Sequence, residues 1–307
     1  MGVIDILAQT IDISDSERKD LRNWYERHMA WYKLLSVDDK QAKAINIIND
    51  EIYLIANSRI PNPFKENQLV MASLVPWDGM WYWSGTQQRL DQCNEEQIKE
   101  LRKNFFKQSS LIIFRYHEDY LEKAEESLKK QHNEFLEHFD NDFIIFNDGL
   151  SMAADLQKLY SKRYDSAPPE QVKKVMKDHG LKNPCPDMPF PEDLLNCEDG
   201  VALYFNQDEG LEIIKDMNSI IGGLKKKGNN LTKFEQYLLR GLVKCDSVSV
   251  HFVHYVVERF GAESIKSAFL IDNDTDEIGL DYLLHRYKGQ FYRTRYPSTS
   301  LSDYCHQ

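Results

Sequence analysis

Two histidines and a glutamate share one face of a predicted helix near the carboxyl end of the chain. The segment SVSVHFVHYVVERF (247–260) has a helical hydrophobic period, in which His251, His254 and Glu258 lie at positions i, i+3 and i+7. Two imidazoles and a carboxylate on one stripe form a ligand set for zinc or iron. The opposite stripe is apolar, and no H-E-x-x-H pattern is present. We therefore expect a solvent-facing stripe that holds no metal, and we keep a metal-dependent hydrolase as the alternative function.

Carboxylates also follow two predicted strands. Asn147-Asp148-Gly149 comes after FIIF (143–146), and the turn containing Asp208 comes after VALYF (201–205). Acidic turns gathered at one end of a shared sheet would suit hydrolysis, so Asp148 and Asp208 belong to the same alternative function. No nucleophile elbow, phosphate loop or dinucleotide glycine pattern accompanies them, and helix capping explains both residues. In each place Gly-Leu follows the turn, which we interpret as a strand leading into a helix and as a sign of internal duplication.

Three tryptophans stand within VPWDGMWYWSGTQQRL (75–90). In a strand that begins at Met80, Trp81 and Trp83 share one face, and a small barrel needs large inward side chains, so we expect both to be buried. Trp77 lies in the turn with Pro76 and Asp78, where burial is difficult. We expect Trp77 to be exposed and to be the recognition aromatic, if one of the three has that role.

The chain ends in an aromatic and basic tail, HRYKGQFYRTRYPSTSLSDYCHQ (285–307). Tyr292, Arg293 and Arg295 could grip an acidic or phosphate-bearing partner. The alternative is that the tail lies against the acidic body of the protein itself, which we favour. We expect residues 286–296 to be ordered, with aromatic side chains packed and basic side chains paired at the rim.

The tryptophans require a sheet to position them, and the sequence predicts one. Five short extended segments follow the first helix, at 31–36, 42–48, 51–57, 68–75 and 80–86, with tight turns at Asn49-Asp50 and Pro76-Trp77-Asp78-Gly79. Five strands in so short a stretch indicate a small β-barrel of the SH3-like or OB-like kind.

Residues 20–90 also resemble a family. The motifs LRNWYERH, YKLLSV and LVMASLVPWDG leading to WYWSG resemble the β-rich segment of uncharacterised bacterial proteins that carry a SEC-C motif. The SEC-C zinc knuckle is absent, because the chain ends in YCHQ without a cysteine cluster. The resemblance therefore implies a fold and carries no function over.

The whole chain reads as an α+β protein in three parts. We expect a helix plus five-stranded β-barrel over 1–92, an α/β unit over 93–183, and a strand-helix unit followed by a mostly helical region with the tail over 184–307. The boundary between the last two is the proline-rich segment NPCPDMPFPED (183–193). Two capping boxes, at Ser14 and Thr232, mark the starts of helices.

Composition limits the function classes. The chain has 307 residues and a net charge of −11, which disfavours broad nucleic-acid binding but leaves a specific site open. Its apolar runs are too short to cross a membrane, and its five cysteines form no C-x-x-C pair, which fits a reducing cytoplasm. Because no catalytic constellation is assembled, we expect a non-enzymatic binding or adaptor protein without a cofactor, whose partner is another protein.

Overall fold

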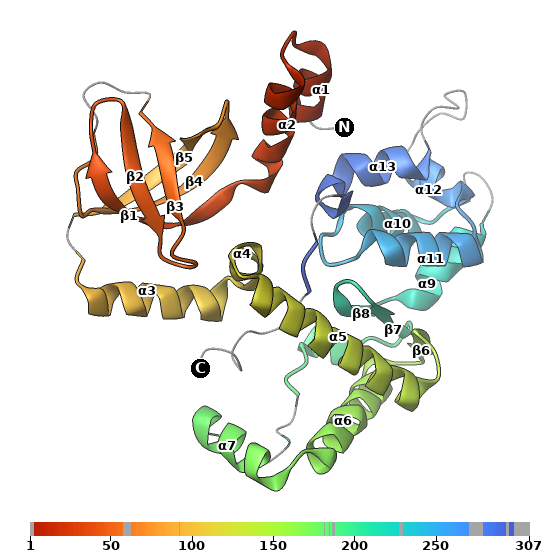
Figure 1. The fold of residues 1–307 in the computed structure, drawn as a ribbon. Coiled ribbons are helices and arrows are strands. Elements are labelled where there is room, and N and C mark those ends of the chain that lie inside the picture. The colour runs from red at the N-terminus through yellow and green to blue at the C-terminus, as the bar shows by residue number, and fades with distance from the viewer. Residues whose placement is uncertain are drawn as a thin grey trace. The chain divides into compact units, whose positions relative to one another are not determined.

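The structure is a computed structural model, which describes residues 3–57, 63–91, 93–180, 182–183, 185, 188–226, 230–269, 279–292 and 295–297. The chain forms two compact units, Met1–Glu126 with Thr294–Gln307, and Ser127–Arg293 (Figure 1). The division falls within helix α5 (Glu118–Phe139), and the proline-rich segment lies inside the second unit. Helices and strands mix as the predicted α+β class requires. No described helix is both long enough and apolar enough to span a membrane.

The first unit is built on a closed five-stranded barrel, as predicted. Its strands are β1 (His28–Val37), β2 (Gln41–Asn46), β3 (Ile52–Ala56), β4 (Leu69–Trp77) and β5 (Met80–Leu90), in the order β1-β2-β3-β5-β4. β1 and β4 pair to close the barrel, and β3 and β5 form its one parallel pair among the described residues. This order is the Greek key of an OB-type barrel and not an SH3-type meander.

Local chemistry explains the two tight turns that the sequence predicts. Asp78 and Gly79 both have positive φ, of 49° and 72°, which is the backbone of a two-residue type I′ hairpin between β4 and β5. Between β2 and β3, the Oδ1 atom of Asn46 accepts a hydrogen bond of 2.9 Å from the backbone N–H of Ile48, and Asp50 has φ of 60°. Asn and Asp tolerate these conformations at low cost.

Helices close the barrel at one end and cover one of its sides. α4 (Ser110–Tyr116) contributes Ile113 and Phe114 to the barrel core, and α3 (Glu95–Gln108) packs on the outside of β1 and β4. Before the barrel stand α1 (Val3–Thr10), which the sequence analysis did not predict, α2 (Asp15–Asn23) and the short η1 (Trp24–Glu26). The predicted capping box at Ser14 begins α2.

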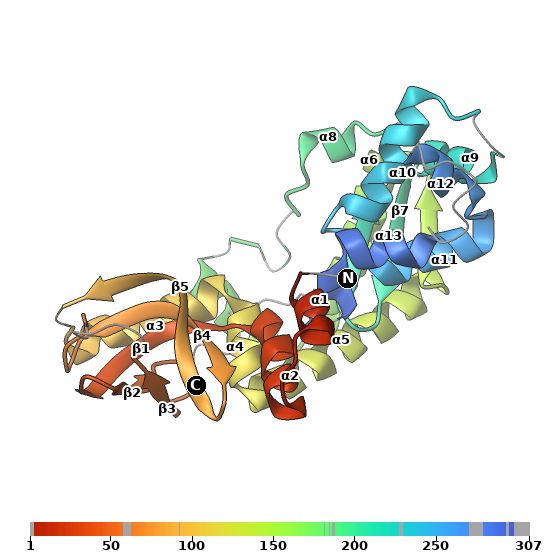
Figure 2. The same ribbon diagram turned by 90° about the horizontal axis from the view of Figure 1, so that it is seen from above.

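The second unit is a three-layer structure around a small sheet (Figures 1 and 2). β6 (Phe143–Phe146), β7 (Val201–Asn206) and β8 (Gly210–Ile214) are antiparallel neighbours in that order. One sheet face packs on helices α5, α6 (Gly149–Ser166) and α8 (Glu192–Leu195). The other packs on the carboxyl-terminal helices, which are α9 (Met217–Lys225), α10 (Lys233–Lys244), α11 (Val250–Phe260), α12 (Glu263–Ala268) and α13 (Leu280–Tyr287). α7 (Pro169–His179) follows α6, and the short η2 (Gly289–Tyr292) follows α13.

The two Gly-Leu turns do not lead into the same structure, so the interpretation as a duplicated strand-to-helix unit is wrong. Gly149 begins α6 as predicted, and a Cβ atom there would lie 1.9 Å from the carbonyl oxygen of Leu194, so only glycine fits. Gly210 instead begins β8, which pairs with β7 from Asn206 to Ala202. The second turn is therefore a hairpin, because the edge of β7 is available to pair with the residues that follow.

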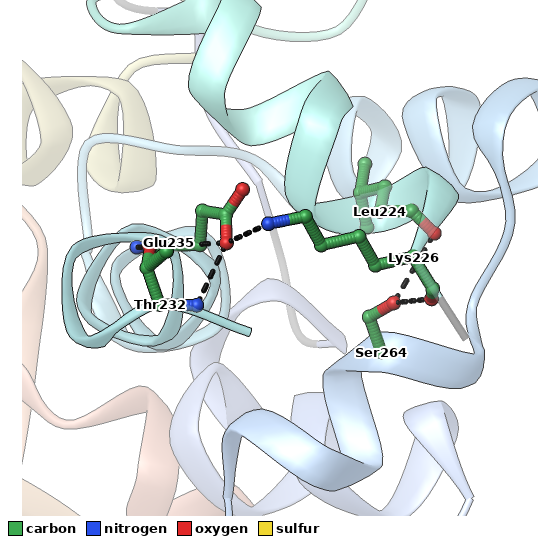
Figure 3. Close-up of polar contacts among 5 residues, drawn as sticks. All are labelled: Leu224, Lys226, Thr232, Glu235 and Ser264. Atoms are coloured by element: carbon green, nitrogen blue, oxygen red, sulfur yellow. Dashed lines mark hydrogen bonds and ion pairs between the residues drawn. The ribbon is translucent and has the colours of Figure 1, made fainter. Parts of the chain in front are cut away.

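Polar contacts link the end of α9 to the start of α10 and to α12 (Figure 3). One carboxylate oxygen of Glu235 accepts hydrogen bonds from the Nζ atom of Lys226 at 2.6 Å and from the backbone N–H of Thr232 at 2.8 Å. On the other side, the buried hydroxyl of Ser264 donates to the carbonyl oxygen of Leu224 at 3.2 Å. The predicted capping box at Thr232 is confirmed and takes Lys226 as an additional partner.

Candidate binding surface

The strands β2 and β3 present two chemically different faces. Their inward side chains fill the barrel and are buried, namely Ala42, Ala44, Tyr53 and Ile55. Because side chains alternate along a strand, the residues between them point outward. On β3 those outward residues are Ile52 and Leu54, which are 54% and 46% exposed.

Register places the outward residues next to one another across the strands. Lys43 lies directly opposite Leu54, and Ile45 lies directly opposite Ile52. Across the parallel pair, Ala56 is the partner of Tyr82, whose neighbours Trp81 and Trp83 point inward. We call this surface the outer β2–β3 face and define it by Lys43, Ile45, Ile52, Leu54 and Tyr82.

On strands β1 and β4, by contrast, a helix covers the outward side chains. The outward residues Trp31 of β1 and Leu69 of β4 are 8% and 0% exposed, because Ile98 and Leu101 of α3 pack on them. No described element does the same for the outer β2–β3 face, where Ile52 and Leu54 keep about half of their surface open to solvent. Apolar side chains that are adjacent and uncovered mark a place for a partner.

Aromatic side chains fill the barrel beneath this face. Tyr32, Tyr53, Trp81 and Trp83 meet in edge-to-face contacts, with ring centroids 5.2–5.8 Å apart. The hydroxyl groups of Tyr32 and Tyr116 lie 3.3 Å apart, and burial raises the pKa of both. Burial also raises the pKa of Tyr53 to about 12. These phenols are therefore neutral packing groups at physiological pH.

Arg102 of α3 and His117, which lies between α4 and α5, also hold the β2–β3 turn in place. The guanidinium of Arg102 on α3 forms an ion pair of 2.6 Å with Asp50, and the ring of His117 donates a hydrogen bond of 2.6 Å to the carbonyl oxygen of Ile48. The face is thus preorganised at its turn end, which lowers the entropy cost of binding.

Acidic residues stand at both ends of the face. Asp38 and Asp39 precede β2, and Asp50 and Glu51 precede β3, which runs in the opposite direction. The carboxylate of Asp38 accepts hydrogen bonds from the backbone N–H groups of Lys40 and Gln41, at 2.7 and 2.8 Å. These hydrogen bonds lower the pKa of Asp38. With Lys40 next to Asp38 and Asp39, that end of the face carries one net negative charge at physiological pH.

The tryptophans differ less in exposure than the sequence predicts. Trp81 and Trp83 do point into the barrel, but both are half-buried, as is Trp77. Trp77 is not exposed because Trp24 packs against it with a centroid distance of 6.1 Å, while the indole N–H of Trp24 donates to the carbonyl oxygen of Pro76. The role of Trp77 as a recognition aromatic stays a prediction.

The histidine stripe on α11 does not form a cluster. His251 lies 3.2 Å from the carboxylate of Asp208, whereas His254 lies 3.9 Å from that of Asp281. Glu258 is exposed near the end of the same helix. Within the described ranges, no group of three or more His, Cys, Asp or Glu side chains could hold a metal ion.

Asp148 and Asp208, in the two acidic turns, have different structural roles. Asp148 accepts a hydrogen bond of 2.7 Å from the backbone N–H of Ser151 in the first turn of α6, which lowers the pKa of Asp148. This is the capping role expected from the sequence. Asp208 stands in the β7–β8 hairpin and pairs with His251, so it caps no helix; the helix expected after it is a strand.

The basic tail divides between the two units. Tyr287 and Phe291 pack on the core of the second unit, and Tyr292 is 42% exposed with its ring stacked on His285 at 3.8 Å. Tyr296 packs on the barrel core in the first unit, and Arg295 beside it is half-buried. Arg293 lies outside the described residues. Residues 289–292 form a 3₁₀ turn.

One tail residue contradicts the expectation of basic side chains at the rim. Lys288 is completely buried, and its Nζ atom donates to the carbonyl oxygens of Cys245 and Val248, the latter at 2.6 Å. Burial lowers the pKa of Lys288 to about 8. Nearby, the buried carboxylate of Glu212 accepts a hydrogen bond of 2.8 Å from the backbone N–H of Ser249, and its burial raises the pKa of Glu212.

Perturbed ionisable groups often mark active sites, but this pair has a structural explanation. Lys288 satisfies two carbonyl groups of the loop between α10 and α11, and Glu212 satisfies an N–H group at the start of α11. Since the side chain of Lys288 has no exposed surface, it offers no access to a substrate.

Comparisons with known proteins return no matching family model, no matching curated protein and no matching solved structure. The function must therefore be argued from the residues of the chain itself. The outer β2–β3 face was missed in the sequence analysis, although IYLIA (52–56) gave a signal: a strand that is apolar at every position has a second face to cover.

Proposed function

We propose that the chain is a non-catalytic binding protein that engages its partner through the outer β2–β3 face. The observation that carries this proposal is the half-exposed pair Ile52 and Leu54 on a barrel whose strands β1 and β4 are covered by helix α3. Surface leucines and isoleucines are common singly, but here Ile52 and Leu54 are neighbours on one strand face, with Ile45 directly opposite Ile52.

The barrel type supports the same face. In OB-type barrels, the surface of strands 2 and 3 with the neighbouring loops is the site that binds oligonucleotides and oligosaccharides. Because a fold alone does not determine a function, the side chains that this barrel exposes there decide the kind of ligand.

The partner we propose is a protein. Residues 28–91 carry six Lys or Arg residues and seven Asp or Glu residues, so the barrel has no excess positive charge with which to hold a phosphate backbone. We also propose a cytoplasmic location, because the described cysteines are all free thiols, as a reducing compartment would keep them.

Affinity capture from native lysate tests this function, with the wild-type chain compared with the double variant Ile52→Asp, Leu54→Asp. Leu111→Asp is the matched control, because Leu111 is 56% exposed but lies on α4. We expect the wild-type chain to capture a partner protein, and this capture to persist after nuclease treatment. The Leu111→Asp variant should capture the same protein, and the double variant should not. Equal capture by all three chains would contradict the proposal.

A further inference from the structure

The outer β2–β3 face has a defined length. The β2–β3 ladder runs through five register pairs, from Gln41 and Ala56 to Ile45 and Ile52. At about 3.4 Å per residue, this ladder matches roughly five residues of an extended chain. Since alternate side chains of an extended chain point the same way, two or three of its side chains can contact the face. Ile45, Ile52, Leu54 and Tyr82 require those side chains to be apolar.

The centre of the face is apolar, whereas acidic residues lie at both of its ends. Asp38 and Asp39 flank one end of the ladder, and Asp50 and Glu51 flank the other. Arg102 pairs with Asp50 at the turn end, and Lys40 follows Asp38 and Asp39 at the other end, so each end carries two carboxylates and one cation. A ligand that covers the apolar centre would bring its own ends close to these carboxylates.

Charge complementarity then decides the ligand class. A ligand with basic residues at both ends would be attracted to the flanking carboxylates, and an acidic or phosphate-bearing ligand would be repelled. Lys43 is the cation at the centre of the face, opposite Leu54, and the two ends together carry four carboxylates against the cations Lys40 and Arg102. A nucleic acid would have to place its phosphates against this negative rim.

We infer that the outer β2–β3 face recognises an extended protein segment in which two or three alternating apolar side chains are flanked on both sides by Lys or Arg. This inference rests on the proposed function and adds to it the chemistry of the partner.

Fluorescence anisotropy with three labelled probes tests the inference on the full chain. The probes are a peptide of sequence KKITLTIKK, its charge-reversed equivalent EEITLTIEE, and single-stranded oligothymidine. We expect KKITLTIKK to bind at least about tenfold more tightly than EEITLTIEE at low salt, and the difference to shrink as salt screens the carboxylates.

Two variants separate the apolar and the charged contributions. Ile52→Asp with Leu54→Asp should weaken binding of KKITLTIKK about tenfold or more, while Leu111→Asp should leave it unchanged. Asp39→Asn with Glu51→Gln removes two charges and keeps the hydrogen-bond acceptor that Glu51 offers to the Tyr53 hydroxyl at 3.3 Å. This pair should reduce the preference for KKITLTIKK over EEITLTIEE to about threefold or less.

The outcomes distinguish the inference from the proposed function. If EEITLTIEE or oligothymidine binds at least as tightly as KKITLTIKK, and Ile52→Asp with Leu54→Asp abolishes that binding, the ligand chemistry is wrong and the face remains a binding site. If no probe shows binding that depends on Ile52 and Leu54, both the inference and the proposed function are contradicted.

Discussion

In the first unit, the apolar side chains of Ile52 and Leu54 stand about half in solvent, whereas in the second unit the charged side chain of Lys288 is completely buried. Isoleucine and leucine are usually buried in folded proteins, and lysine is usually exposed. The buried lysine is explained within its own unit, because two carbonyl oxygens and the ring of Phe291 at 5.3 Å surround its ammonium group. The exposed ladder on the barrel has no such explanation among the described residues. The burial of Lys288 therefore has a structural role within its own unit. The exposure of Ile52 and Leu54 instead indicates contact with a partner.

The largest expected effect contrasts the two faces of the barrel wall. Tyr32→Ala removes a fully buried ring from the barrel core and should lower the free energy of unfolding by about 3–5 kcal/mol. Leu54→Ala, on the outer face, should change it by no more than about 0.5 kcal/mol. Urea denaturation of both variants measures the difference. A Leu54→Ala cost near that of Tyr32→Ala would mean that the outer face is part of a core.

The buried lysine should make the stability depend on alkaline pH. The folded state releases the Lys288 proton near pH 8, while the unfolded chain holds it to about 10.5, so the unfolded state binds more protons between these values. The free energy of unfolding should therefore rise by about 2 kcal/mol from pH 8 to pH 10. Above pH 10 the tyrosines act in the opposite direction, because burial raises the pKa of Tyr53 and Tyr204 to about 12.

Lys288→Met is the control for this pH dependence. Denaturation at pH 8, 9 and 10 should show the rise in the wild type and a nearly flat profile in the variant. The same rise in both proteins would show that Lys288 is not the titrating group.

Glu235 should give a smaller effect on the acid side. The hydrogen bonds from Lys226 and Thr232 lower the pKa of Glu235, so its carboxylate stabilises the folded state above the unfolded value of 4.5 and loses that effect as pH falls through the folded pKa. Glu235→Gln should cost about 1 kcal/mol at pH 7 and almost nothing once the wild-type carboxylate is protonated. Thermal unfolding at pH 7 and pH 3 checks this, and a cost that persists at pH 3 would contradict the assignment.

The smallest expected effect concerns metal. Because His251 and His254 pair with different aspartates, added zinc should not raise the melting temperature, and EDTA should not lower it. Elemental analysis of the purified protein should find no stoichiometric metal. One equivalent of zinc that disappears in a His251→Ala, His254→Ala double variant would restore the hydrolase alternative.

Much of the barrel could be predicted because its information is local. Alternating residues and turn chemistry such as Asp78-Gly79 determine strands and hairpins from a few neighbouring positions. The hairpin at Gly210 was mistaken for the start of a helix, because the same Gly-Leu pair starts a helix at Gly149. At Gly210 the following residues pair with the edge of β7, and the local sequence does not show that this edge is available.

The functional surface was less predictable for a related reason. Period-two alternation shows that Ile52 and Leu54 share a face, but only the packing of α3 shows that β1 and β4 are the covered strands. Similarly, the sequence around Lys288 suggests a rim position, since nothing nearby in the chain reveals the carbonyl groups of Cys245 and Val248.

Site-specific photo-crosslinking tests the central claim most directly. A photoreactive amino acid is placed at position 54 on the outer β2–β3 face, or at position 111 on α4, and the protein is irradiated in native lysate. The account predicts a discrete protein adduct from position 54 that disappears when Ile52→Asp is added, and no such adduct from position 111. Equal adduct patterns from both positions, or an adduct that Ile52→Asp leaves unchanged, would contradict the claim that this face is the binding surface.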